Sequence, residues 1–76
     1  MIRIDEIRNS YEEHGFLVVK SSRSNGFEFL YLEIYSNEEM LRKGQYLTSL
    51  QFNKEGTQLL FVGLSIDYND IIYVPV

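Results

Sequence analysis

Hydrophobic side chains occupy both faces of the segment from Phe27 to Tyr35. Its odd positions are mainly aromatic and its even positions are aliphatic, with Phe27, Phe29, Tyr31 and Tyr35 in the first set and Leu30, Leu32 and Ile34 in the second. Successive side chains of a strand point to opposite faces of a sheet. A small domain can cover one face with its own helix, so the aromatic face predicts contact with another molecule.

Helical spacing is clear near the N-terminus. The residues that share one helix face, at spacings of three, four and three, are Ile4, Ile7, Tyr11 and His14. This pattern predicts a helix from about Arg3 to His14, with Gly15 as its C-terminal cap. A helix of about twelve residues is marginal in water by itself, so we expect this face to pack on a sheet.

Four other segments have strand-like patterns and are separated by turn residues. They are Phe16–Lys20, Gln45–Asn53, Gln58–Ile66 and Ile71–Val76. The connections between strands include a polar loop, Ser21–Gly26, a tight turn, Lys54–Gly56, and a turn-forming cluster, Asp67–Asp70. Pro75 has no N–H to donate, so we expect the last strand at a sheet edge.

A short helical segment is expected between Tyr35 and Gln45. Ser36 and Glu39 have the spacing of a capping box, and Gly44 closes the segment. Met40 and Leu41 are then expected to cover one end of the core. The sequence therefore predicts one α+β domain over residues 1–76, in which the N-terminal helix packs on a mostly antiparallel five-stranded meander sheet.

Composition narrows the functional classes. Eleven acidic and seven dispersed basic residues give a formal charge of −4, which disfavours direct binding to nucleic acid and favours a partner with a basic surface. The chain has no cysteine, and no purely apolar run exceeds the four residues of Leu59–Val62. Charged residues also interrupt the N-terminal apolar positions. We therefore expect a cytoplasmic protein without a signal peptide or a membrane span.

No residue pattern predicts catalysis. His14 is the only histidine, and its position at a helix end suits a capping role. Glu12–Glu13 and Glu38–Glu39 are sequence neighbours, so on a helix they point about 100° apart and form no acid–base pair. The Asp67–Asp70 cluster lacks the glycine and the distant glutamate of a calcium-binding EF-hand. We expect no enzyme activity, no cofactor and no metal.

Aromatic residues and acidic charge together predict protein binding. The predicted partner-binding residues are Phe29, Tyr31, Glu33 and Tyr35, with Glu38 and Glu39 as an acidic rim. The function that fits best is stoichiometric inhibition or regulation of another protein, of the kind carried out by phage-encoded and immunity proteins.

Two alternatives stay open. The aromatic face can join two copies in a homodimer with a structural or ligand-sensing role. The acidic residues can instead mimic phosphates and inhibit a nucleic-acid enzyme. The pattern also leaves open which face the helix covers, because a helix on the aromatic face would expose Leu30, Leu32 and Ile34 instead.

Overall fold

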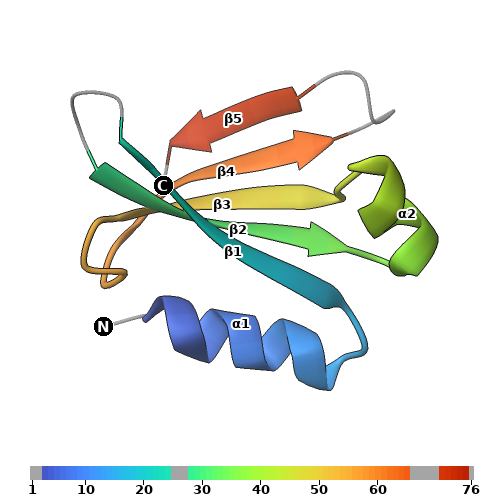
Figure 1. The fold of residues 1–76 in the computed structure, drawn as a ribbon. Coiled ribbons are helices and arrows are strands. Elements are labelled where there is room, and N and C mark those ends of the chain that lie inside the picture. The colour runs from blue at the N-terminus through green and yellow to red at the C-terminus, as the bar shows by residue number, and fades with distance from the viewer. Residues whose placement is uncertain (1–2, 25–27, 66–70, 76) are drawn as a thin grey trace.

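A computed structural model describes residues 3–24, 28–65 and 71–75 of the chain. The elements are α1 (Ile4–Glu13), β1 (Leu17–Ser24), β2 (Glu28–Tyr35), α2 (Glu38–Lys43), β3 (Thr48–Asn53), β4 (Leu59–Ser65) and β5 (Ile71–Pro75). Neighbouring strands pair antiparallel in the order β1-β2-β3-β4-β5, so each strand lies beside the next one in the chain (Figure 1). The predicted α+β class is confirmed, and the strand that contains Pro75 lies at a sheet edge as expected.

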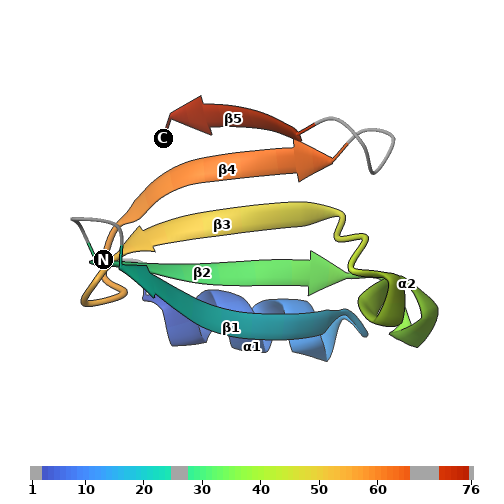
Figure 2. The same ribbon diagram turned by 45° about the horizontal axis from the view of Figure 1, so that its top comes forward.

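Helix α1 covers only one face of the sheet, across β1 and β2 (Figures 1 and 2). Ile4, which is 3% exposed, is buried against the even positions of β2 and β3. The buried cluster beneath the helix consists of Ile4, Leu32, Ile34, Leu50 and Phe52. The helix therefore covers the aliphatic face of β2, which answers the question that the sequence left open.

The start of α1 is held by the turn between β3 and β4. Arg3 occupies the N-cap position but its side chain makes no capping hydrogen bond. The Ile4 N–H instead donates to the carbonyl oxygen of Gly56 at 2.8 Å, which satisfies one of the free N–H groups at the helix start. Gly56 has φ +69°, and a Cβ there would lie 2.5 Å from Ile4 Cγ2. Glycine is thus required at Gly56 both by the predicted turn and by the close approach of the helix.

The end of α1 differs from the prediction at His14. The helix stops at Glu13, His14 is its C-cap, and Gly15 follows with φ +88°. His14 is exposed, and its Nδ1–H donates to the carbonyl oxygen of Ser10 at 2.7 Å. The prediction that His14 lies on the core-facing stripe is therefore wrong, whereas its predicted role at the helix end fits. Tyr11 closes the stripe instead, with its ring edge-on to the ring of Phe16.

Strand β1 is longer than the sequence predicted. Ser21 to Ser24 were expected in a loop, but they pair in register with β2, from Ser21 opposite Tyr31 to Ser24 opposite Glu28. Polar residues are tolerated there because β1 is an edge strand, and Ser22 is exposed. Several predicted features lie outside the described residues: Asn25–Gly26, Phe27, Ile66 and Asp67–Asp70.

Helix α2 begins one residue later than the capping-box pattern predicted. Asn37 is the N-cap, and its side chain accepts a hydrogen bond from the Met40 N–H at 2.9 Å. Gly44 ends the helix in the left-handed conformation, as expected. Met40 and Leu41 are half-buried and lie outside the buried cluster, so the prediction that they cover the core is wrong.

The pairing of strands β3 and β4 has one irregularity. The register shifts between Gln51 and Phe52, so that Phe52 faces Leu59. Simple alternation would place Leu60 on the same face as Val62, yet Leu59 and Val62 are the residues that pack against the buried cluster. An extra residue in one strand reverses the facing of the residues beyond it, and this shift is not visible in the alternation itself.

Candidate protein-binding face

The sheet face opposite α1 is called the open face here. Neither described helix covers it: α1 lies on the other side and α2 lies where β2 ends (Figures 1 and 2). The strand register assigns the described side chains of this face. They are Leu17, Val19 and Ser21 from β1, Phe29, Tyr31, Glu33 and Tyr35 from β2, Ser49, Gln51 and Asn53 from β3, and Phe61 from β4.

Aromatic rings lie near the middle of the open face. Tyr31 is in register with Gln51, and Gln51 is in register with Phe61, so these three residues form one row across the sheet, the Tyr31 row. Phe61 is 37% exposed, and Phe29 and Tyr31 are half-buried. The rings of Phe29 and Tyr31 meet edge to face with centroids 6.4 Å apart. The two predicted aromatic residues therefore share a surface with Phe61, which the sequence analysis did not select.

Glu33 occupies the next row across the sheet, between Val19 on β1 and Ser49 on β3. It is half-buried, and it is the only charged residue among the open-face side chains that the structure describes. Its Oε2 accepts a hydrogen bond from the Tyr35 hydroxyl at 3.4 Å. None of the ion pairs among the described side chains includes Glu33. The carboxylate thus sits in a mostly uncharged surface with one long hydrogen bond.

Tyr35 supports Glu33 and has little surface of its own. It is 5% exposed, and its ring meets the ring of Tyr46 edge to face at 6.4 Å. Burial, then the negative charge of Glu33, then the hydrogen bond to Glu33 raise the pKa of the Tyr35 hydroxyl above its ordinary value. Of the predicted binding residues, Tyr35 is therefore placed to position the Glu33 carboxylate and offers a partner almost no contact area.

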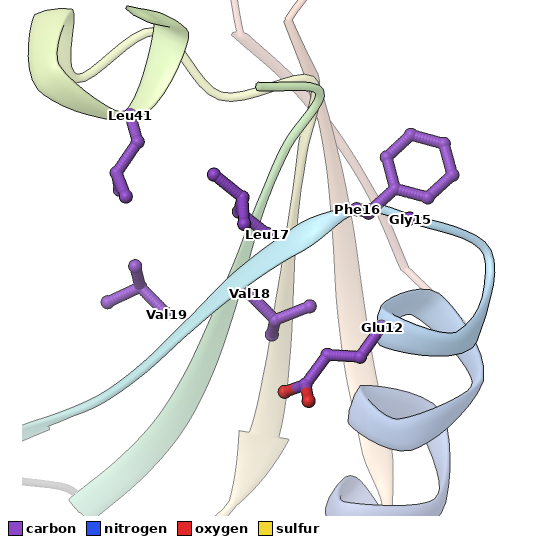
Figure 3. A pocket seen from close by; sticks show the side chains of 7 residues that line it. All are labelled: Glu12, Gly15, Phe16, Leu17, Val18, Val19 and Leu41. Carbon is purple, nitrogen blue, oxygen red and sulfur yellow. The ribbon is translucent and has the colours of Figure 1, made fainter. Parts of the chain in front are cut away.

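An open cleft of about 480 Å³ lies at the first residues of β1. The side chains of Leu17 and Val19 lie on the same side of β1 as Leu41 of α2, while Val18 and Glu12 lie on the other side (Figure 3). The register places Leu17 and Val19 on the open face, so this apolar surface extends toward the edge of the sheet. The sequence analysis treated both residues only as members of a strand, because their neighbours across the sheet were unknown.

The predicted acidic rim lies at one end of the open face. Glu38 and Glu39 are exposed in the first turn of α2, and Glu39 forms an ion pair with Lys43 at 3.0 Å. Six residues separate Phe29 from Tyr35, which is about 20 Å along an extended strand, and α2 follows Tyr35. The rim therefore adjoins the Tyr35 end of the face and lies far from Phe29.

Comparison with protein families, with curated proteins and with solved structures finds no match. Within the described residues, there is no group of three or more acidic or histidine side chains that could hold a metal ion. Neither of the helices in this part of the chain is long and apolar enough to cross a membrane. The candidate function must therefore be argued from the geometry of the open face.

Proposed function

We propose that this protein is an interaction module that binds another protein through its open face and acts as a stoichiometric inhibitor or regulator. The supporting observation is that α1 covers the aliphatic face of β2 and leaves its aromatic face without a described covering element. Aromatic side chains give a large contact area at low conformational cost, and protein interfaces are enriched in them.

The central contacts are assigned to Phe29, Tyr31 and Phe61, which surround the middle of the face, with Glu33 beside them. Val19 and Leu17 extend the apolar surface onto β1, at the edge of the sheet. Glu38 and Glu39 add negative charge at one end, which suits a partner with a basic surface and speeds its approach.

The phosphate-mimicking alternative has less support from the geometry. Mimicry needs several carboxylates spread across one surface, whereas Glu33 is alone among the described open-face side chains, and Glu38 and Glu39 lie at its end. A homodimer through the open face uses the same aromatic contacts as the proposed function. The affinity-capture experiment therefore also tests for the homodimer.

The experiment is affinity capture from the native host's lysate at low and moderate salt, with wild-type protein and matched variants as baits. Phe61→Ala and Leu64→Ala are the matched pair, because both residues are exposed on β4 but the register places them on opposite faces. We expect one saturable partner at a fixed ratio, which is then purified for affinity measurements. Tyr31→Ala and Phe61→Ala should each weaken its binding about tenfold, or about 1.4 kcal/mol, and Leu64→Ala should not.

Two results would contradict the proposal. Equal binding by Tyr31→Ala and wild-type protein would remove the open face from the interface, provided that the variant is folded. Recovery of the bait alone as a stable dimer would favour the homodimer instead. With the partner in hand, Glu38→Lys should slow association and reduce its salt dependence, and an unchanged association rate would remove the acidic rim from the account.

A further inference from the structure

The central carboxylate of the open face restricts the chemistry of the partner. Resting on the proposed function, we propose that the partner presents an arginine side chain to Glu33. The carboxylate is half-buried between Val19 and Ser49, and Tyr31 and Tyr35 flank it on the same strand face. Its position among these residues makes its environment sensitive to anything that covers the face.

Glu33 retains unused hydrogen-bonding capacity. A carboxylate has about four acceptor positions. The Tyr35 hydroxyl donates to Oε2 at 3.4 Å, which is longer than the usual range of about 2.5 to 3.0 Å for an O–H···O bond. No side chain that the structure describes forms an ion pair with Glu33. In the free protein, water can reach the remaining acceptor positions.

A partner that covers Tyr31 and Phe61 also removes water from Glu33, because the Tyr31 row lies next to the row that contains Glu33 and Ser49. Taking a carboxylate out of water is costly unless a positive charge or several hydrogen bonds replace the water. Tight binding therefore requires that the partner bring a positive charge or several hydrogen-bond donors to this position.

Arginine fits this position better than lysine. Its planar guanidinium donates two parallel hydrogen bonds to one carboxylate and also stacks on aromatic rings. Tyr31 provides a ring two residues from Glu33 on the same face of β2. Ser49 and Gly63, which continue the row of Glu33 toward β4, have a small side chain and none, and both are buried.

The test uses Nα-acetyl-arginine amide as the probe and Nα-acetyl-citrulline amide as the uncharged control of similar shape. Binding is followed by NMR on labelled protein, through the Glu33 side-chain carboxyl carbon and the backbone amides of Tyr31, Glu33 and Ser49. We expect saturable shifts with the arginine probe, at least fivefold weaker binding of the citrulline probe, and loss of the response in Glu33→Gln. Glu13→Gln, which removes an exposed carboxylate from α1 on the other side of the sheet, should bind the probe like the wild type.

Equal responses of wild-type protein and Glu33→Gln would overturn the inference, as would shifts confined to Glu38 and Glu39. The lysine analogue of the probe gives a further comparison, and binding equal to that of arginine would contradict the choice of arginine. The captured partner separates this inference from the function on which it rests. If Tyr31→Ala weakens binding of the captured partner and Glu33→Gln does not, the arginine proposal fails while the proposed function survives. If neither variant weakens binding of that partner, both the arginine proposal and the proposed function fail.

Discussion

The two faces of the sheet use the same strands and both carry large hydrophobic side chains, but the exposure of these side chains differs. Beneath α1, Leu32, Ile34 and Phe52 are almost fully buried, whereas Phe61 on the open face is 37% exposed. The difference comes from α1, which packs on only one side of the sheet. An apolar strand face is therefore a core only where another element covers it, and otherwise it is a surface available for binding.

The largest expected effect comes from the same substitution on each face. Phe52→Ala should lower the free energy of unfolding by about 3 to 5 kcal/mol, because it leaves a cavity under α1. Phe61→Ala should lower it by about 1 kcal/mol, because the ring is already partly in water. Urea unfolding followed by circular dichroism measures both values. Equal losses would mean that the open face is also part of the core.

The second effect tests how α1 is held on its face. Gly56 and Gly44 both have φ +69°, but a Cβ at Gly56 would meet Ile4 at 2.5 Å while a Cβ at Gly44 would meet nothing within 4 Å. Gly44→Ala should cost about 1 kcal/mol from backbone strain alone. Gly56→Ala should cost about 1 to 3 kcal/mol more because the side chain must displace the helix. Similar unfolding free energies for the two variants would show that α1 does not press on this turn.

A smaller effect tests α2, which closes one end of the open face. Asn37→Ala should lower stability by about 1 kcal/mol, because the side chain caps the Met40 N–H. Ser36→Ala is the control and should change stability by less than about 0.5 kcal/mol, since Ser36 is exposed and is not the cap. Thermal unfolding of both variants provides the comparison. A larger loss in Ser36→Ala would restore the capping box that the sequence predicted.

The smallest effect concerns the titration of Tyr35 on the open face. The tyrosine ring carbon bonded to oxygen, followed by NMR, should report a pKa above 10.0, chiefly because the hydroxyl is buried and secondarily because Glu33 is close. Glu33→Gln should lower this pKa without removing the contribution of burial.

The same shift predicts how stability depends on pH. Because the folded-state pKa is raised, the stabilisation is fully present below the unfolded pKa and is lost as pH rises through the folded pKa. Tyr35→Phe should therefore reduce the loss of stability in that alkaline range. A Tyr35 that titrates at or below 10.0 would contradict the buried pair.

Local patterns predicted the elements well, and tertiary contacts account for most differences. The spacing of Ile4, Ile7 and Tyr11 located α1, and Gly44 located the end of α2. Ser21 to Ser24 were misassigned because polar residues join a strand when a neighbouring strand offers backbone partners. The register shift beside Phe52 could not be read from alternation, since it depends on how two strands meet.

The candidate site was predictable only in part, for the same reason. Alternation placed Phe29, Tyr31 and Glu33 on one face, but the choice of the helix-covered face depended on packing. The burial of Tyr35 depends on Tyr46, which is eleven residues away in the chain. Phe61 joins the face only through the pairing of β3 with β4.

The most direct test of the open face as the binding surface is hydroxyl-radical footprinting of the protein, free and bound to the partner found by capture. The account predicts that Phe29, Tyr31 and Phe61 are oxidised in the free protein and protected in the complex, while Leu64 and His14 are oxidised equally in both. Protection of Leu64 with unchanged oxidation of Tyr31 and Phe61 would contradict it and would place the interface on the opposite side of the sheet.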